Sequence, residues 1–280
     1  MLQDLLEPVS IIAEAAGRDV MAVYERADLG VQIKGDNSPL TEADLASHRR
    51  IVEGLAALTP DWPVLSEESA AEISASERLQ WQRYWLVDPL DGTKEFIKRN
   101  GEFTVNIALV QAHRPVLGVV HVPARDLTYL GVEGVGAWRN QGGERREPIR
   151  VGPVASPRRV VGSRSHAGVH LESYARALGA HELVTRGSSL KLCLVAEGSA
   201  DVYPRFGPTS EWDTAAAQAV VVSAGGNVLD LRGRALLCNR GGSLLNPYFI
   251  VFGDASVDWL APVSPELLKE AFASPKPRES

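Results

Sequence analysis

The sequence predicts an α/β protein built in two parts, because the order of its helix and strand patterns changes along the chain. The first part opens with two amphipathic helix patterns and continues with a series of strand patterns. In the second part, short apolar strands alternate with helix patterns, which is typical of layered α/β proteins. The chain has 280 residues, enough for one large domain or two moderate ones. Pro and Gly cluster over residues 151–157, so we predict an α+β domain over residues 1–153 and an α/β domain over 154–273.

Helices are predicted from apolar residues that recur every three or four positions. Residues 2–27 show this spacing, and residues 34–39 break it. A second helix is predicted from Thr41 to about Leu58, since Thr41 followed by Asp44 resembles a capping box. Further helices are predicted at residues 170–178, 189–197 and 213–224, and the tail, 274–280, is predicted to be disordered.

Strands are predicted where β-branched and aromatic residues gather. In the first part these are residues 64–65, 84–87, 103–109, 116–122 and 127–132, followed by a hairpin or exposed loop at 134–147. In the second part they are residues 159–161, 183–184, 201–203, 228–231 and 249–252.

Composition limits the class of protein. No apolar run approaches the ~20 residues of a membrane span, and the first residues lack the basic region of a signal peptide. The two cysteines, Cys193 and Cys238, have no metal-type spacing and fit a reducing cytoplasm. The net charge of −6 argues against broad nucleic-acid binding, although a local cation cluster can still bind a small anion.

The strongest chemical signal is the sequence Asp-Pro-Leu-Asp-Gly-Thr at residues 88–93, which follows the strand at 84–87. Asp88 and Asp91 would converge at the end of this strand, with the Leu90 carbonyl between them. Carboxylates and carbonyls are the ligands that hard divalent cations prefer. The alternative is an ordinary turn, in which Thr93 caps a helix.

Two further acidic positions point the same way. Glu67 and Glu68 follow the short strand at 64–65, and Asp213 begins an alanine-rich helix. By themselves they are explained by a solvated loop and an N-cap. Together with Asp88 and Asp91, they predict a cation site.

These motifs resemble the signature of the inositol monophosphatase superfamily. The sequence DGTKEFIKRNGEFT at 91–104 resembles its bacterial 3′(2′),5′-bisphosphate nucleotidase branch, as do GSSLK at 187–191 and YPRFGP at 203–208. The resemblance covers the chain to about Gly253. It implies the sugar-phosphatase fold, an α/β/α/β/α sandwich. It also implies hydrolysis of adenosine 3′,5′-bisphosphate to AMP, with the sulfated nucleotide as a further candidate substrate, and sensitivity to lithium.

The resemblance implies the following roles. Two or three Mg²⁺ ions would be held by Glu67, Asp88, the Leu90 carbonyl, Asp91 and Asp213. Glu67 and Thr93 would position and activate the attacking water, and Asp44 would assist through the water shell of the metal. The substrate would contact Leu90, Asp91, Gly92, Thr93, His166, Ser188, Lys191, Arg205 and Asp213.

Within that set, Lys191 and Arg205 are predicted to hold the phosphate that is not cleaved, with Ser188 as a donor, because arginine forks suit phosphate oxygens. The alternatives are a solvated helix residue for Lys191 and a surface ion pair for Arg205. His166 is predicted to contact the nucleoside, or else to be structural.

Other functions stay open at this point. An inositol monophosphatase or a sugar bisphosphatase would use the same metal site, and a catalytically silent nucleotide-binding regulator would use the same pocket. A scaffold would not explain the acidic cluster. We expect a cytoplasmic monomer or homodimer, with peripheral association at the inner membrane as an open alternative.

Overall fold

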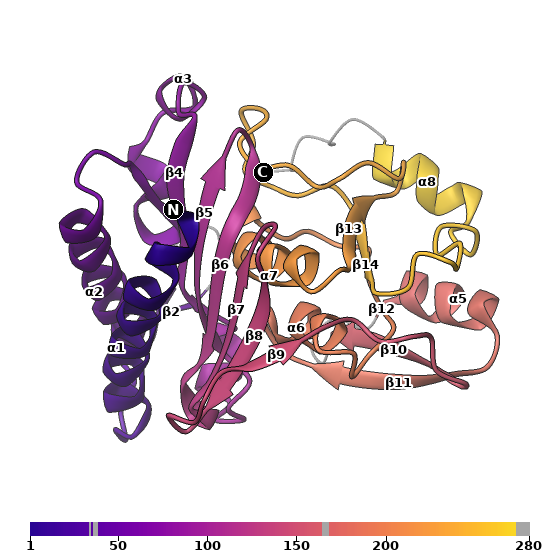
Figure 1. Cartoon of the computed structure of the whole chain (residues 1–280), viewed down its shortest axis with the longest axis horizontal. Helices are drawn as coiled ribbons and strands as arrows, with labels where there is room; N and C mark the ends of the chain where they lie inside the picture. Colours follow the sequence, from indigo (N-terminus) through magenta and orange to yellow (C-terminus); the bar gives the residue numbers. More distant parts are fainter. Residues whose placement is uncertain (34, 36–38, 164–167, 273–280) are drawn as a thin grey trace.

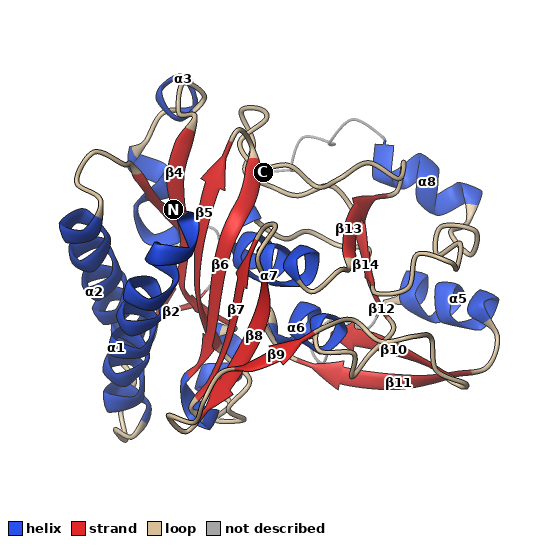
Figure 2. Ribbon diagram, viewed as in Figure 1, coloured by secondary structure: helices blue, strands red, loops and turns tan. Residues whose placement is uncertain are grey.

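Helices and sheets alternate in five layers in the computed structural model of the chain (Figure 1). The structure describes residues 1–33, 35, 39–163 and 168–272. The layers are α1 with α2, a seven-stranded sheet, α6 with α7, a five-stranded sheet, and α5 with α8 (Figure 2). This arrangement agrees with the predicted layered α/β fold. The predicted tail, 274–280, and most of the break at 34–39 lie outside the described residues.

The seven-stranded sheet is formed entirely by the first part of the chain, in the order β3-β4-β5-β6-β7-β8-β9. Its strands are β3 (Val64–Ser66), β4 (Arg83–Asp91), β5 (Thr104–Gln111), β6 (Arg114–Val122), β7 (Leu127–Val132), β8 (Gly136–Gln141) and β9 (Glu147–Ile149). Only the β3–β4 pair is parallel. The strand predicted at residues 84–87 is longer in the structure, because β4 continues to Asp91 through a shift in its register with β5.

The five-stranded sheet belongs to the second part, in the order β11-β10-β12-β14-β13. Its strands are β10 (Arg158–Ser163), β11 (His181–Arg186), β12 (Val202–Arg205), β13 (Asn227–Asp230) and β14 (Phe249–Phe252). A small sheet pairs β1 (Gln32–Ile33) with β2 (Pro39–Leu40), which the sequence did not predict.

The helices begin and end close to the predicted residues. They are α1 (Leu6–Tyr24), α2 (Glu42–Leu58), α3 (Ala75–Arg78), α4 (Thr93–Ile97), α5 (Val169–Leu178), α6 (Leu190–Ala196), α7 (Glu211–Ser223) and α8 (Pro265–Phe272), with short 3₁₀ turns at Leu2–Leu5, Glu67–Glu72 and Pro123–Arg125. Thr41 and Asp44 form the predicted capping box of α2. Asp213 does not begin α7 as predicted, because Ser210 is the N-cap and Asp213 is the third helical residue. Helices α3 and α8 were not predicted.

Helix α7 lies almost in contact with the backbone of the seven-stranded sheet, and glycines in that sheet make this possible. A Cβ added at Gly118 of β6 would lie 2.0 Å from the Ala216 carbonyl oxygen, and one at Gly131 of β7 would lie 2.6 Å from Val220 Cα. Small residues on both sides therefore set the distance between sheet and helix. This contact fixes where the first turn of α7 and its Asp213 lie.

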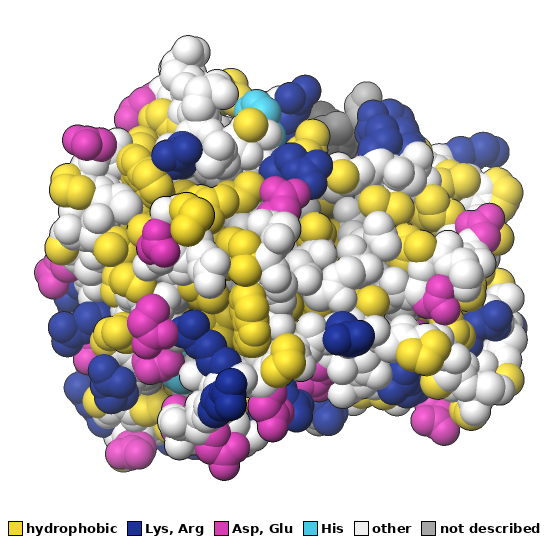
Figure 3. All heavy atoms as spheres, viewed as in Figure 1, with side chains coloured by type: hydrophobic (Ala, Val, Ile, Leu, Met, Phe, Trp, Pro, Cys, Tyr) yellow, Lys and Arg dark blue, Asp and Glu magenta, His cyan; other side chains and the backbone are white. Residues whose placement is uncertain are grey.

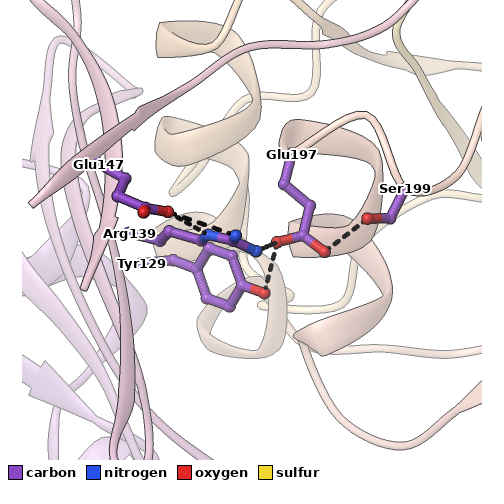
Figure 4. Close-up of polar contacts among 5 residues, drawn as sticks. All are labelled: Tyr129, Arg139, Glu147, Glu197 and Ser199. Carbon is purple, nitrogen blue, oxygen red and sulfur yellow. Dashed lines mark hydrogen bonds and ion pairs between the residues drawn. The ribbon is translucent and has the colours of Figure 1, made fainter. Parts of the chain in front are cut away.

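The two sheets share one hydrophobic core around α6 and α7, which includes Leu86 and Val120 from one sheet and Phe249 and Val251 from the other. A polar cluster also joins the seven-stranded sheet to the end of α6 (Figure 4). Glu197, the residue that follows α6, accepts a hydrogen bond of 2.9 Å from the Tyr129 hydroxyl and one of 3.0 Å from Arg139. The division into domains at residues 153 and 154 stays a prediction.

The surface shown in Figure 3 intersperses acidic and basic side chains over both halves of the molecule. Both cysteines are buried and free. Among the described helices, we find none that is both long and apolar enough to cross a membrane.

Candidate active site

A cleft of about 540 Å³ lies where residues of the two halves of the chain meet. Ten of the predicted site residues line it: Glu67, Asp88, Leu90, Asp91, Gly92, Thr93, Ser188, Lys191, Arg205 and Asp213. Asp44 does not line the cleft itself, but its carboxylate lies within hydrogen-bonding distance of the Thr93 hydroxyl, which does. His166 lies outside the described residues. The structure thus brings together positions that lie up to 146 residues apart (213 − 67).

The end of β4 supplies two carboxylates and one carbonyl. Asp88 is 1% exposed, and its Oδ1 accepts a hydrogen bond of 3.0 Å from the Leu90 amide. The Ser47 hydroxyl of α2 donates to the Pro89 carbonyl at 2.7 Å, which holds this irregular segment against the helix. The register shift between Asp88 and Asp91 then turns Asp91 into the cleft.

Asp213 reaches the same cleft from α7. Its Oδ2 accepts a hydrogen bond of 2.9 Å from the Ser210 amide, which completes the capping box. Asp91 likewise uses its Oδ2, which accepts from the Ser189 amide at 2.5 Å. Asp213 is therefore not the N-cap itself but the third helical residue, which completes the cap of Ser210. The other oxygen of Asp91 and of Asp213 accepts no hydrogen bond from the described residues.

The charges of these carboxylates oppose one another. Burial raises the pKa of Asp213 to about 8, and the charges of Asp91 and Glu67 also raise it. Burial likewise raises the pKa of Asp91 to about 6, against the lowering effect of Lys191. For Asp88, burial and then Glu67, Asp91 and Asp213 hold the pKa well above its ordinary value. Buried carboxylates that repel one another are stabilised by a bound cation.

The donor set fits a hard divalent cation, because it contains only carboxylate and carbonyl oxygens. Within the described residues, no group of three or more His, Cys, Asp or Glu side chains is already arranged to hold a metal ion. In each of Asp88, Asp91 and Asp213, one carboxylate oxygen accepts a hydrogen bond from a backbone amide, that of Leu90, Ser189 and Ser210 respectively.

Thr93 and Asp44 form a connected pair at the cleft. The Thr93 hydroxyl lies 3.3 Å from Asp44 Oδ1 and 3.3 Å from the Leu90 carbonyl oxygen. The other Asp44 oxygen accepts from the Thr41 amide and hydroxyl at 2.7 and 2.6 Å. Burial raises the pKa of Asp44 to about 6, and these Thr41 hydrogen bonds lower it. Thr93 is the first residue of α4, whose N-cap is Gly92, so the predicted cap was displaced by one residue.

Lys191 and Arg205 lie on the cleft wall formed by the second part of the chain. Lys191 is 8% exposed, donates to the Ser188 carbonyl at 2.5 Å and has its pKa lowered by burial. The solvated-residue alternative for Lys191 is therefore wrong. Arg205 donates from Nη2 to the Pro208 carbonyl at 2.7 Å, and its Nε is buried with no partner among the described residues. The buried Ser188 hydroxyl also lacks a described partner. Both residues line the cleft, so their donors are candidates for binding a ligand there.

Sequence reasoning missed several residues that line the cleft, among them His170 and Phe206. Phe206 follows Arg205 in the YPRFGP sequence. Because Arg205 was predicted to bind substrate, its position could have indicated that Phe206 also lies at the cleft. His170 gave no signal, because only packing shows which side of α5 faces the cleft.

Comparisons with known proteins agree with this geometry. The model described as "Inositol monophosphatase family" matches residues 1–258. The chain is 52% identical over 248 residues to the 3′(2′),5′-bisphosphate nucleotidase CysQ of Escherichia coli (strain K12), covering 88% of this chain and 99% of that protein. It is 38% identical over 259 residues to the CysQ nucleotidase of Haemophilus influenzae, covering 92% and 96%. The crystal structure of CysQ from Bacteroides thetaiotaomicron superposes with a TM-score of 0.78 at 44% identity, covering 88% and 96%.

Proposed function

The chain belongs to the inositol monophosphatase family, and on that basis we propose that it is a Mg²⁺-dependent phosphatase that hydrolyses the 3′-phosphate of adenosine 3′,5′-bisphosphate. The products are AMP and inorganic phosphate. One observation carries the proposal: acidic oxygens from β4, α7 and the segment after β3 meet two cations, Lys191 and Arg205, in one cleft. The name of the E. coli relative, 52% identical, supports the choice of substrate.

We assign the metal to the acidic part of the cleft. Glu67, Asp88, Asp91, Asp213 and the Leu90 carbonyl would hold two or three Mg²⁺ ions. When bound, Mg²⁺ neutralises charge on the phosphate oxygens and activates water. The metal would also relieve the repulsion that raises the pKa values of the aspartates.

The chain's own residues position the reactants. Thr93 orients the attacking water through its hydroxyl, which Asp44 and the Leu90 carbonyl hold in place. Glu67 acts with Thr93 to position and activate that water. The water oxygen forms the new bond to phosphorus as the P–O3′ bond breaks, and the water's proton ends on the leaving 3′ oxygen of AMP. Lys191, Arg205 and Ser188 bind the phosphate that stays on the nucleotide, since charge-assisted donors suit its oxygens. We also propose that the enzyme acts on a small molecule in the cytoplasm, as a monomer or homodimer.

A phosphate-release assay tests this function. The purified chain with Mg²⁺ is given adenosine 3′,5′-bisphosphate, its 5′-phosphosulfate analogue or inositol 1-phosphate. We expect the highest kcat/KM for an adenosine nucleotide, loss of activity in excess chelator, and recovery with Mg²⁺. Lithium is expected to inhibit at millimolar concentration, whereas sodium is not. A preference for inositol phosphate would instead favour an inositol monophosphatase, and no turnover of any ester would favour the silent regulator.

A further inference from the structure

We propose that His170 and Phe206 form the wall of the cleft that receives the base of the nucleotide, and that Glu270 of helix α8 holds His170 in this position. The inference rests on the proposed function and deepens it, because it assigns base recognition to residues outside the metal and phosphate sites. The ligand class is a planar heteroaromatic base.

His170 is fixed at the cleft by two other elements. It is the second residue of α5 and lines the cleft with its side chain 34% exposed. Its Nε2 lies 3.0 Å from Glu270 Oε2, and Glu270 Oε1 accepts a hydrogen bond of 3.0 Å from the Tyr248 hydroxyl. The Glu270 carboxylate therefore connects three parts of the chain: α8, to which it belongs, α5, and the segment just before β14. Because Glu270 accepts from Nε2, the imidazole plane is held in one orientation.

Phe206 is held by other aromatic rings. Its ring centroid lies 5.5 Å from that of Tyr174 and 6.5 Å from that of Tyr248, both with T-shaped geometry. Tyr174 is itself anchored by a hydrogen bond of 2.8 Å to the Trp259 carbonyl. Tyr248 thus contacts both Phe206 and the carboxylate that holds His170. A pre-oriented aromatic surface stacks on a base with little loss of side-chain entropy.

Charge explains why the base belongs on this wall. The carboxylates and cations of the cleft suit metal ions and phosphates, whereas an uncharged base gains from aromatic and apolar surface. Phe206 and His170 both line the cleft and supply such surface. They are linked through Tyr248, whose ring contacts Phe206 and whose hydroxyl donates to the Glu270 carboxylate that pairs with His170.

Helix α8 follows residue 258, where the family match ends. The helix is anchored by the buried Leu267, which packs in one cluster with Trp259 and Val263. Figure 1 shows α8 and α5 in the same outer layer of the molecule.

Steady-state kinetics on the full chain with Mg²⁺ test the inference. Two substrates are compared: adenosine 3′,5′-bisphosphate and ribose 3,5-bisphosphate, which carries the same phosphates without a base. His170→Ala and Phe206→Leu are expected to raise KM for the nucleotide roughly ten-fold, in the range of lost base stacking. KM for the base-free substrate and kcat for both stay close to wild type. His181→Ala, an exposed histidine of the same half, is the matched control and changes neither KM.

Glu270 is tested as a positioning residue. Glu270→Ala is expected to raise KM for the nucleotide several-fold, and Glu270→Gln, which keeps an acceptor oxygen, to restore most of it. Equal changes on the two substrates, or none, would overturn the inference while leaving the proposed function standing. A wild-type enzyme that ignores adenosine bisphosphate would overturn both. If Phe206→Leu does not fold, the partly exposed His170 decides the result alone.

Discussion

Asp91 shows how one residue can combine a structural and a chemical role. Its Oδ2 accepts from the Ser189 amide and so ties β4 to the segment before α6, while it also lies in the charge field of Glu67 and Lys191. Asp91 can therefore hold the backbone through one oxygen and still be available to bind a cation through the other. A change at Asp91 can separate the two.

We expect Asp91→Asn to lower kcat roughly a thousand-fold while the fold survives. Asparagine has the same size and keeps an oxygen for the Ser189 amide, but it removes a negative charge from the proposed metal site. Turnover at saturating Mg²⁺ and circular dichroism are measured together, with the exposed Asp61→Asn as control. Near-normal turnover would show that Asp91 serves the turn alone.

Arg205→Ala is expected to lower kcat/KM for adenosine 3′,5′-bisphosphate about ten- to a hundred-fold, because a charge-assisted contact contributes about 1.5–3 kcal/mol. A substrate with a single phosphate is expected to be affected far less, and the Mg²⁺ dependence to stay the same. Arg234→Ala, whose side chain is 65% exposed, is the matched control. Equal losses on the two substrates would assign Arg205 to the fold, and no loss would make it a surface residue.

His121 is a buried histidine away from the cleft lining, and it links stability to pH. It is 4% exposed, lies 2.9 Å from the Thr128 hydroxyl, and a Cβ on Gly17 would come within 2.4 Å of its ring. Burial lowers its pKa from 6.5 to about 4, with Arg18 lowering it further and Asp126 raising it. The folded state thus binds this proton more weakly than the unfolded state does.

It follows that His121 contributes stability above pH 6.5 that is lost as the pH falls through about 4. Between pH 7.5 and pH 4 the loss is about 3 kcal/mol, at 1.36 kcal/mol per pKa unit. We expect His121→Gln to remove this part of the pH dependence, as measured by urea unfolding at both pH values. Equal pH dependence in the two proteins would contradict the prediction.

At the scale of elements, the position of α7 decides whether Asp213 reaches the cleft. The helix is rich in alanine, and its Ala215, Ala216 and Ala217 are almost fully buried. Small side chains let the helix approach the sheet backbone at Gly118 and Gly131. The metal site therefore depends on glycines that lie outside it.

We expect Gly118→Ala to lower the free energy of unfolding by about 1–3 kcal/mol, the usual cost of overpacking. It should also lower kcat, since the added methyl group displaces α7 from the Ala216 carbonyl oxygen, 2.0 Å away. Denaturant unfolding and turnover are the measurements. Gly241→Ala, where no atom lies within 4 Å, is the control. If Gly118→Ala unfolds with the wild-type free energy, the sheet and α7 can move apart without loss of stability, and the prediction is wrong.

For the whole molecule, the candidate active site depends on the contact between the two halves of the chain, because residues of both line the cleft. The cluster around Glu197 lies at this contact (Figure 4). The Glu197 side chain is 9% exposed. It accepts hydrogen bonds from Tyr129 and Arg139 of the first half of the chain and from Ser199 of the second.

We expect Glu197→Ala to lower the free energy of unfolding by about 2 kcal/mol, because it leaves the Tyr129 hydroxyl without its acceptor. Glu147→Ala is the matched control: this side chain also pairs with Arg139 but is 64% exposed, so its loss costs less than about 1 kcal/mol. Equal effects of the two changes in denaturant unfolding would show that burial of Glu197 is unimportant.

The sequence by itself determined the elements and the acidic motifs. Local signals were sufficient for α2, whose capping box is formed by Thr41 and Asp44, and for most strands, because their periodicity depends on neighbouring residues. The carboxylates of the candidate site were also found, since their motifs resemble those of a known family.

Only the tertiary structure decided the remainder. The extension of β4 to Asp91 depends on pairing with β5, and the position of the small helix α8 depends on the packing of Leu267 with Trp259 and Val263. Burial of Lys191 and the placement of His170 beside Glu270 arise from contacts between segments far apart in the chain. Such contacts depend on how whole layers pack, and packing energy is not encoded in the spacing of residues along a single segment.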